Sequence, residues 1–404
     1  MRIAIANWSR RRVGGTEVYL DEIIRGLHRR GHELGFFCEG DAPADRQPIN
    51  LPARCPVWCV SESGMAGALA NLKAWRPDVV YVHRLSLPTV DESVLQVAPA
   101  VLFPHDYQRT CISGTKAFTR PVMRPCRRKF GVCCLALYFP RGCGSEIVGV
   151  WRAFRRTSRQ LNVARRYRAI IVQSRYMRAE YLKHGFAPDS VHTVRYDGAG
   201  EGDGEQASTP AGEISAAPVR LLFIGRMQSI KGGDILLDAL PAVAAALGRP
   251  VNLVCAGDGE ERRNWEQHAR GIVARHCIHV EFPGWVNQEQ IQRLALASDL
   301  LVFPSVWPEP FGRIGREVGL MRLPAAAFAV GGNGEWLIDG VNGYLAPADP
   351  PSAAKLAAAI AKCLRDSATH SRLRDGALRI ARRFSLDNHL EQLSTLFAAV
   401  ARQA

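Results

Sequence analysis

Two glutamates, Glu309 and Glu317, are the residues of this chain whose types and spacing most clearly suggest chemistry. They lie in the segment WPEPFGRIGRE, directly after the apolar run 300–303. The prolines on both sides of Glu309 keep it out of a helix, and Gly312 can open a helix that carries Glu317. A loop after a parallel strand is where open α/β sheets bind ligands, and a helix N-terminus offers free N–H groups to a phosphate. Each carboxylate could grip a pair of hydroxyls on a sugar or a ribose. A capping carboxylate plus a surface glutamate is the alternative.

Two cations, Arg226 and Lys231, lie on the turn that follows another apolar run, 219–224. Arginine offers a bidentate fork and lysine a point charge, which together suit a diphosphate. A solvated basic turn is the alternative.

Gly15 and His105 each follow a predicted strand of the N-terminal half. Gly15 lies in the segment VGGTE, where two glycines let the backbone approach an anionic ligand at a helix N-terminus. His105 follows the apolar run 100–104. The alternatives are a plain tight turn and a histidine that is merely hydrogen-bonded.

These residues need elements that position them, and strand-like runs alternate with amphipathic segments along the chain. This alternation predicts an α/β fold with parallel sheets covered on both faces. The helices include Thr16–Arg30, which Gly31 ends. The expected strands are 2–7, 33–38, 79–83, 100–104, 169–173, 219–224, 251–256, 278–282, 300–304 and 325–330.

A Gly-, Ser- and Ala-rich stretch divides the chain into two halves of similar size. We expect a first domain over 1–197, a linker over 198–217, a second domain over 218–385 and a terminal helix over 386–404.

Charge is concentrated in one window of the first domain. The 404 residues carry 52 Lys+Arg and 38 Asp+Glu, a net charge of +14. The window 109–168 holds 15 of the basic residues and a single acid, Glu146, so the rest of the chain nets zero. A local excess implies a local partner.

Composition and motifs exclude several classes of protein. Apolar residues make up 47% of the chain, as in a globular protein, and no apolar run approaches the roughly 20 residues of a membrane-spanning helix. The N-terminus has no signal-peptide pattern, so we expect a cytoplasmic protein. Walker A, HExxH and strict GxGxxG patterns are missing from the sequence.

Taken together, these motifs resemble those of the retaining glycosyltransferases of family 4, also called group 1, which have the GT-B fold. The resemblance rests on the two glutamates with PFG between them, the GR…KG turn, and the segments GDGE at 257–260, GGNGE at 331–335 and GVNG at 340–343. It implies two Rossmann-like domains facing a cleft, with the acceptor in the first and the donor in the second. The C-terminal helix would return to the first domain.

The resemblance also implies roles for the residues. Arg226 and Lys231 would neutralise the donor diphosphate as it leaves, so no metal is expected. Glu317 would hold the ribose, and Glu309 would contact the transferred sugar beside the backbone N–H groups of Phe311 and Gly312. His105 would lie near the reacting sugar, and Gly15 near the diphosphate.

Two departures from the family pattern affect the sugar contacts. Arg313, Gly315 and Arg316 stand where apolar residues are usual, and the stretch before Gly331 lacks the usual Gly-x-Pro. The predicted diphosphate and ribose contacts do not depend on these positions.

Five cysteines lie between Cys111 and Cys143. Cys111, Cys126, Cys133 and Cys143 are candidate ligands of a structural zinc ion, although CxxC pairs are missing there. Reduced cysteines that pack in the interior are the alternative.

Arginines recur at helical spacing from Arg152 to Arg168. This segment could lie on an anionic membrane surface, bind an anionic lipid-linked acceptor, or form a solvated helix face.

We therefore expect a glycosyltransferase of the EC 2.4 class that needs no cofactor. It would take a UDP- or GDP-type sugar donor and a glycan or lipid-linked acceptor of cell-surface polysaccharide or glycolipid synthesis, such as lipopolysaccharide. It would be cytoplasmic, with peripheral contact at the inner face of the membrane. A non-catalytic sugar-nucleotide-binding protein is the alternative. Nucleic-acid binding is not expected, because no recognisable module accompanies the arginines.

Overall fold

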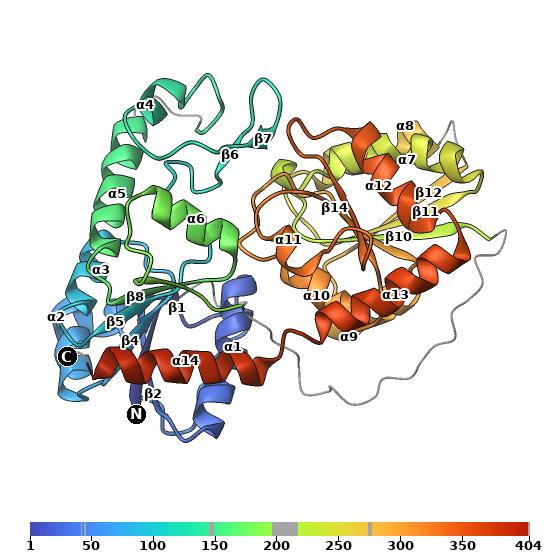
Figure 1. Cartoon of the computed structure of the whole chain (residues 1–404). Helices are drawn as coiled ribbons and strands as arrows, with labels where there is room; N and C mark the ends of the chain where they lie inside the picture. Colours follow the sequence, from blue (N-terminus) through green and yellow to red (C-terminus); the bar gives the residue numbers. More distant parts are fainter. Residues whose placement is uncertain (42, 44–45, 145–148, 196–216, 274–276, 403–404) are drawn as a thin grey trace.

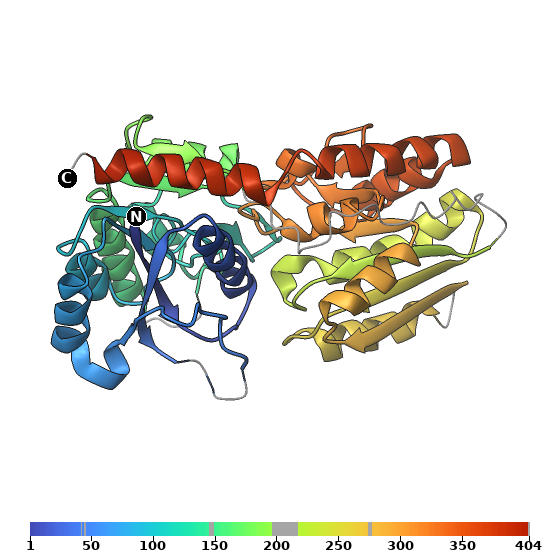
Figure 2. The same cartoon turned by 90° about the horizontal axis from the view of Figure 1, so that it is seen from below.

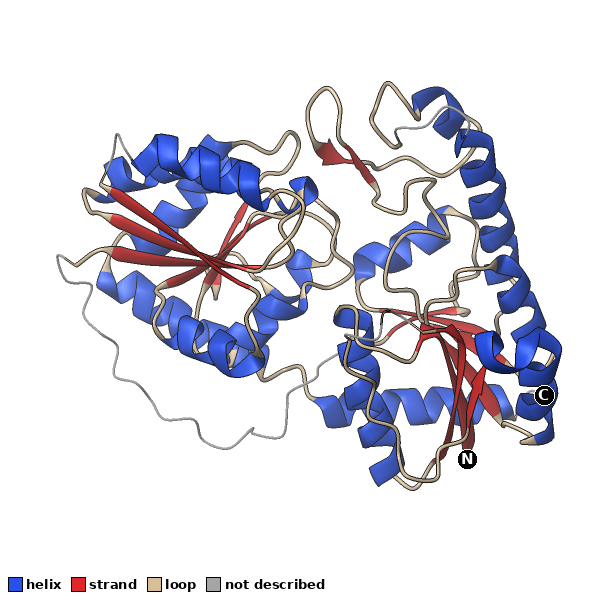
Figure 3. Ribbon diagram, turned by 180° about the vertical axis from the view of Figure 1, so that it is seen from behind, coloured by secondary structure: helices blue, strands red, loops and turns tan. Residues whose placement is uncertain are grey.

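Two parallel sheets, each covered by helices on both faces, make up the protein (Figure 1). The computed structural model describes residues 1–41, 43, 46–144, 149–195, 217–273 and 277–402. Figure 3 shows the two sheets lying apart, each inside its own set of helices. The expected α/β fold with two Rossmann-like units is therefore confirmed.

The first sheet has the strand order β3-β2-β1-β4-β5-β8-β9, and every adjacent pair is parallel. Its strands are β1 (Arg2–Ser9), β2 (Glu33–Gly40), β3 (Val57–Cys59), β4 (Val79–Val82), β5 (Ala100–Leu102), β8 (Ala169–Val172) and β9 (Val191–Thr193). The helices of this unit are α1 (Gly15–Arg29), α2 (Val60–Ala74), α3 (Pro88–Val94), α4 (Cys133–Leu137), α5 (Gly149–Ala164) and α6 (Arg175–Lys183).

Strand β1 shows why this sheet is buried on both faces. Its alternate residues Ile3 and Ile5 pack with α1 and the C-terminal helix, whereas Ala4 and Ala6 pack with α2, α3, α5 and α6. A strand with apolar residues on both faces is expected at the centre of a parallel sheet.

The second sheet has the strand order β12-β11-β10-β13-β14-β15, again with parallel neighbours. Its strands are β10 (Val219–Ile224), β11 (Val251–Ala256), β12 (Ile278–Gly284), β13 (Leu300–Phe303), β14 (Ala325–Phe328) and β15 (Gly343–Ala346). Its helices are the short 3₁₀ turn η1 (Ser229–Lys231), α7 (Gly233–Leu247), α8 (Arg262–Val273), α9 (Gln288–Leu296), α10 (Arg313–Gly319), α11 (Asn333–Trp336), α12 (Ala353–Leu364) and α13 (Ser367–Ala381).

The last helix, α14 (Leu386–Ala401), returns to the first domain, as expected. Figure 2 shows it lying along that domain after the chain crosses from α13. Ser385 caps its N-terminus by accepting a hydrogen bond from the backbone N–H of Asn388. The crossing is fixed from the second domain, because Arg316 donates to the carbonyl oxygen of Phe384 at 2.8 Å. Arg316, one of the departures from the family pattern, is thus a buried structural residue.

Residues 109–168, the basic window, lie between β5 and β8 in the chain of the first domain. It contains the small antiparallel pair β6 (Ala117–Phe118) and β7 (Arg124–Pro125), followed by α4 and α5. A buried ion pair between Lys116 and Glu180 ties it to α6. A second buried pair, Arg109 with Asp91 at 2.7 Å, ties its start to α3.

The expected elements differ from the observed ones mainly at the sheet edges. The edge strands β3, β9 and β15 were not predicted; they have three or four residues, as do the predicted strands β4, β5, β13 and β14, so their length alone does not explain the difference. Gly31, with φ 79°, ends α1 as expected. The predicted linker 198–217 lies outside the described residues, apart from Ala217.

Candidate active site between the two domains

Glu309 lies on the loop between β13 and α10, at the carboxyl edge of the second sheet. As expected, Gly312 caps α10 with φ 93°, a left-handed conformation that favours glycine. The loop is held from behind by the next loop along the sheet: the backbone N–H of Gly332 donates to the carbonyl oxygen of Glu309 at 2.7 Å. Phe311 is buried beneath it. The backbone therefore fixes Glu309 at the carboxyl edge of the second sheet.

Lys231 forms an ion pair with Glu309, although 78 residues separate them in the sequence. The same carboxylate accepts a hydrogen bond from the Oγ of Ser305 at 3.0 Å. The lysine ammonium also lies 4.6 Å from the centre of the Trp307 ring, a cation–π contact. Only 17% of the Lys231 side chain and 9% of that of Glu309 are exposed. The two predicted residues are thus brought together as a nearly desolvated pair.

Arg226, the other predicted cation, extends from the same turn and is exposed. It faces the first domain, because a Cβ added at Gly14 would lie 3.7 Å from its Nη2 atom. A Cβ at Gly15 would meet no protein atom within 4 Å, so the neighbouring space is open to a ligand. Two of the predicted diphosphate residues, Arg226 of the second domain and Gly15 of the first, therefore lie near each other at the domain boundary.

The side chain of Trp307 connects the Glu309 loop to the first domain. It packs against the apolar cluster that includes Tyr107 and Val172. Burial raises the pKa of Tyr107, and the negative charge of Glu309 is among the charges that raise it further. The Trp307 side chain therefore joins the Glu309 loop to the core of the first domain.

His105 lies at the carboxyl edge of the first sheet, half-buried between two polar neighbours. Its Nε2 is 3.0 Å from Nδ1 of His83, and its Nδ1 is 3.5 Å from Nε2 of Gln173. Burial lowers the pKa of His105 to about 3, and the positive charges of Arg84 and Arg313 lower it further. His105 is therefore a neutral imidazole at physiological pH.

Beneath His105, a chain of hydrogen bonds connects the first sheet to α14. His389 donates from Nδ1 to the carbonyl oxygen of Arg195 at 2.9 Å, because a carbonyl can only accept. Burial lowers the pKa of His389 to about 4, so its Nε2 is free to accept from the hydroxyl of Tyr19 at 3.0 Å. Tyr81 then donates to Tyr19 at 2.6 Å. The returning helix therefore helps to build the floor of the site.

Glu317, the predicted ribose ligand, lies one helical turn from Arg313 and pairs with its guanidinium at 3.1 Å. Arg313 also reaches the first domain, where it contacts the carbonyl oxygen of Gly15 and the carboxylate of Glu22. Glu317 therefore lies at the domain boundary, but it is held by a protein cation.

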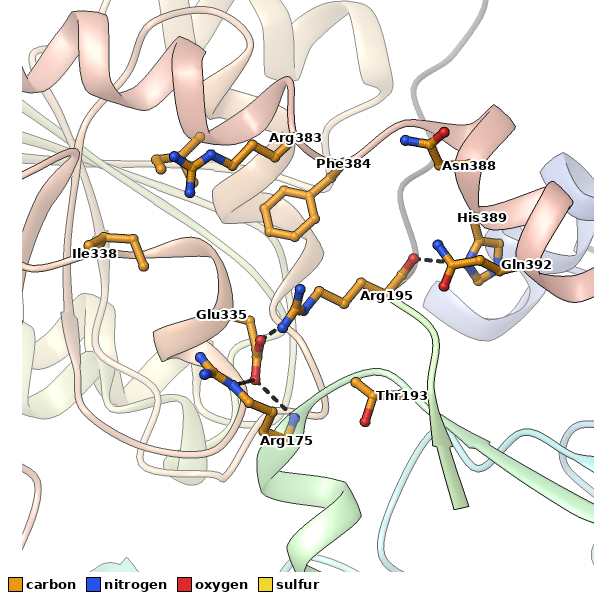
Figure 4. Close-up of a pocket in the computed structure, with 11 residues that line it drawn as sticks. Arg175, Thr193, Arg195, Glu335, Ile338, Arg383, Phe384, Asn388, His389 and Gln392 are labelled. Carbon is orange, nitrogen blue, oxygen red and sulfur yellow. Dashed lines mark hydrogen bonds and ion pairs between the residues drawn. The ribbon is translucent and has the colours of Figure 1, made fainter. Parts of the chain in front are cut away.

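A second connection between the domains lies beside a cavity of about 280 Å³ near the crossing to α14. Figure 4 shows Glu335 of α11 between two arginines of the first domain. Its carboxylate accepts from the backbone N–H of Arg175 at 2.9 Å, and from Nε of Arg195 at 2.9 Å. Glu335 belongs to the GGNGE segment, for which the sequence suggested no role.

The candidate zinc ligands differ in how far they are exposed to solvent. Cys111 is buried, Cys126 and Cys143 are half-buried, and Cys133 is exposed, whereas Cys134 packs beside Cys143 on a small apolar cluster. Within the described ranges, no group of three or more His, Cys, Asp or Glu residues is arranged to hold a metal ion.

The basic window is only partly available to a partner. Arg109 and Lys116 are buried and paired, and Arg159 pairs with Glu92 at 2.6 Å. Arg156 and Arg165 donate to backbone carbonyl groups. Part of the excess charge therefore fastens the window to the domain, and the prediction of a local partner concerns the cations that remain exposed.

One group of exposed cations lies at the far end of the window, which we call the basic tip (Figure 1), whereas others, such as Arg166 and Arg168, lie at its C-terminal end. The basic tip combines exposed cations with two exposed apolar side chains, Val132 (73% exposed) and Trp151 (63% exposed). Its cations are Arg128, Lys129, Arg152 and Arg155. In the part of the chain that the structure describes, no helix is long and apolar enough to cross a membrane.

Several site residues were missed by the reasoning from sequence. His83 and Gln173 stand at the ends of predicted strands, so the rule that selected His105 would have found them. No local signal marks Ser305 or Glu22, and Glu335 was noticed only as the end of the GGNGE segment, because its partners Arg175 and Arg195 are distant in sequence.

Two family models match the chain, and together they account for most of it. Residues 13–195 match the model described as glycosyltransferase family 4, and residues 208–379 match the model described as glycosyl transferases group 1.

Curated relatives match parts of the chain. Spore coat protein SA of Bacillus subtilis (strain 168) is 35% identical over 129 residues, which are 31% of this chain and 34% of that protein. D-inositol 3-phosphate glycosyltransferase 1 of Catenulispora acidiphila is 32% identical over 233 residues, 53% of each. The chain thus spans between a third and about half of the length of these two relatives.

Among solved structures, Anabaena HepE in complex with UDP and glucose has the same fold. Its TM-score is 0.67 at 19% sequence identity, over 99% of this chain and 100% of that chain.

Proposed function

The chain belongs to the group 1 (family 4) glycosyltransferases with the GT-B fold, and from this premise we propose that it is a retaining enzyme. It would transfer a sugar from a nucleoside diphosphate sugar to a glycan or lipid-linked acceptor, in the synthesis of a cell-surface polysaccharide or glycolipid.

The observation that carries this proposal is the pairing of Lys231 with Glu309 at the mouth of the cleft. Both side chains are nearly desolvated and stand at the carboxyl edge of the second sheet, and Arg226 of the same turn lies beside Gly14, next to the open space at Gly15. A ligand with a negative charge of its own can replace Glu309 as the partner of Lys231. The Glu309 carboxylate can then accept hydrogen bonds from sugar hydroxyls. A nucleoside diphosphate sugar supplies both groups in one molecule.

The other residues have compatible roles in this scheme. Arg226 is exposed and aimed across the cleft, so it can join Lys231 in neutralising the diphosphate as the bond to the sugar breaks. The N-terminus of α10 offers free N–H groups beside Phe311 and Gly312. His105 is a neutral imidazole whose Nε2 is held by His83, and its Nδ1, which makes a long contact of 3.5 Å with Gln173, can exchange that contact for a sugar hydroxyl without adding a charge.

Retention of configuration would follow from attack on the same face that the diphosphate leaves. In that mechanism a phosphate oxygen of the donor takes the proton of the acceptor hydroxyl. The bond from the anomeric carbon to the leaving oxygen breaks, and the bond to the acceptor oxygen forms. Lys231 and Arg226 would stabilise the charge that develops on the diphosphate.

We assign the acceptor to the first domain and its recruitment to the basic tip. Four exposed cations beside Val132 and Trp151 suit an anionic membrane surface that presents a lipid-linked acceptor. Each cation near anionic headgroups contributes about 1 kcal/mol, and an exposed indole favours the interface. The contact would be peripheral.

A screen of nucleotide sugars by thermal shift tests the donor site. UDP- and GDP-linked sugars are compared, because a bound donor raises the melting temperature according to its concentration and Kd. We expect one donor class to stabilise the wild type, and Lys231→Ala or Glu317→Ala to lose most of that shift. Exposed Arg293→Ala on α9 is the matched control.

Product analysis then separates an enzyme from a silent binding protein. Transfer or slow hydrolysis of the stabilising donor, with the anomeric configuration kept in the product, supports the proposal. A donor that binds without turnover, or a product of inverted configuration, would contradict it. An unchanged shift in both variants would show that the donor lies elsewhere.

Vesicle flotation tests the membrane contact. We expect binding to vesicles with anionic lipid that falls at high salt, and its loss in Arg152→Glu/Arg155→Glu. The control Arg263→Glu/Arg270→Glu changes two exposed arginines of α8 and should bind normally. Equal flotation of both variants would exclude the basic tip.

A further inference from the structure

Arg313 occupies a position where the family usually has an apolar residue, and the structure gives its charge a set of partners. It is the first residue of α10, and its guanidinium contacts groups of both domains. Nη1 lies 3.3 Å from the carbonyl oxygen of Gly15. Nη2 lies 3.4 Å from Oε1 of Glu22 and 3.1 Å from Oε1 of Glu317.

These contacts join the two domains at the point where the proposed donor would lie. Gly15 and Glu22 belong to α1 of the first domain, whereas Glu317 belongs to α10 of the second. The side chains are largely removed from water, with exposed fractions of 22% for Arg313, 14% for Glu22 and 18% for Glu317. An arginine in such surroundings has a fixed geometry and is not a solvated surface cation.

Two carboxylates, one from each domain, share this guanidinium. Burial raises the pKa of Glu22, the positive charge of Arg313 lowers it, and the negative charge of Glu317 raises it again. Arg25 and Arg316 are the other cations that act on Glu22. Arg316 already donates to a backbone carbonyl, and Arg25 lies 3.5 Å from Asp21. Without Arg313, the two carboxylates would repel each other across the domain boundary.

We propose that Arg313 is a positioning residue that couples the closure of the two domains to the orientation of Glu317. Its guanidinium neutralises the acid of each domain at once, so the cleft closes only when both acids share it. The role of Glu317 towards the ribose rests on the proposed function, but the coupling between the domains does not.

The test first removes the positive charge of Arg313, which leaves Glu22 and Glu317 to repel each other. It then removes the negative charge of Glu22. Arg313→Met keeps the aliphatic length of the side chain, and Glu22→Gln is added in a double variant. Arg313→Lys keeps the charge but loses the planar fork. Arg293→Met, on an exposed face of α9, is the matched control.

The first measurement needs no donor. Small-angle X-ray scattering should give a larger radius of gyration for Arg313→Met than for the wild type, because the domains separate. The double variant should return towards the wild-type value, and Arg293→Met should not change. An unchanged radius in Arg313→Met would overturn the proposal.

The second measurement uses the donor found in the thermal-shift screen. We expect Arg313→Met to weaken its affinity about tenfold at pH 8, and Glu22→Gln to recover most of that loss. The affinity of Arg313→Met should also improve as the pH falls, because a proton on Glu22 removes the repulsion. Glu22→Gln should abolish this dependence, and Arg313→Lys should fall between the wild type and Arg313→Met.

The outcomes separate the two claims. A larger radius that Glu22→Gln restores supports the coupling even if no nucleotide sugar binds the wild type, a result that would overturn only the proposed function. If the donor binds but Glu22→Gln restores neither radius nor affinity, Arg313 acts directly on the ligand, and the positioning role is overturned.

Discussion

Replacing Lys231 by methionine offers the most direct test of the central pair. In the protein without donor, the Lys231 ammonium is the charged partner of the Glu309 carboxylate, which also accepts a hydrogen bond from the hydroxyl of Ser305. The carboxylate is 9% exposed, so water cannot take the place of the lysine without rearrangement of the loop. The variant should therefore lose stability even before any ligand is considered.

The magnitude follows from the burial of the pair. Removing one partner of a fully buried ion pair costs about 3–5 kcal/mol. Here the lysine is 17% exposed and borders the cleft, so we expect the lower part of that range or slightly less, about 2–3 kcal/mol. For domains of this size 1 kcal/mol corresponds to about 2–4 °C, which predicts a fall in Tm of about 5–10 °C.

Glu309→Gln provides the matched comparison. The glutamine can still accept from Ser305, and the lysine keeps its contact with the Trp307 ring, so this variant should lose only about 1 kcal/mol. In the double variant the unpaired carboxylate no longer exists. Its loss should be smaller than the sum of the single losses by about 1–2 kcal/mol.

Thermal and chemical denaturation of the four proteins, followed by circular dichroism, measure these differences. A Tm of Lys231→Met within about 1 °C of the wild type would refute the reasoning, and so would strict additivity in the double variant. Either result would mean that Glu309 is already solvated and that the pair does not hold the loop.

Three further predictions concern stability and domain arrangement. Lys116→Met should cost about 2–3 kcal/mol in chemical denaturation, because the buried carboxylate of Glu180 loses one of the two lysines that pair with it and keeps Lys183, and adding Glu180→Gln should recover part of the loss. Burial lowers the pKa of His389 from the ordinary 6.5 to about 4, so between these pH values the unfolded chain binds more protons than the folded protein, and stability is lost as the pH falls from about 6.5 towards 4. His389→Gln should reduce the dependence of the free energy of unfolding on pH in this range by about 1.4 kcal/mol per pH unit, as measured by urea denaturation at several pH values. Glu335→Gln should loosen the contact with Arg195 and increase the radius of gyration, whereas an unchanged scattering profile would show that this contact does not hold the domains together.

Much of the fold was predictable because its signals are local. The apolar runs that became β1, β10 and β13 are continuous, and the helices between them have clear periodicity. The short edge strands β3 and β9 carry no such signal. They are defined by pairing with a neighbouring strand, which no short window of sequence contains.

The candidate site, like the fold, could be predicted from the sequence only in part. Glu309, Lys231 and His105 were selected because each follows a strand, and parallel strands place their carboxyl ends at one edge of a sheet. The ion pair between the first two, and the histidine that holds the third, depend on loops being packed against each other.

The basic window shows the limit of reasoning from charge. Its composition predicted a local partner, but Arg109 and Lys116 are buried with acids from elsewhere in the chain. Net charge counts residues, whereas the availability of a charge depends on burial, which only the packed structure determines.

The sequence by itself determined the fold class, the order of the elements, the family resemblance and the residues at the strand ends, because these follow from periodicity, glycine and proline placement, and motif spacing. Only the tertiary structure decided which of these residues meet. Arg313 is the clearest case: in the sequence it is a departure from a pattern, and in the structure it lies between Glu22 and Glu317 of opposite domains. The physical reason is that an interaction across a domain boundary arises from the packing of two separate domains. The sequence of neither domain contains a periodic pattern that reports such a contact.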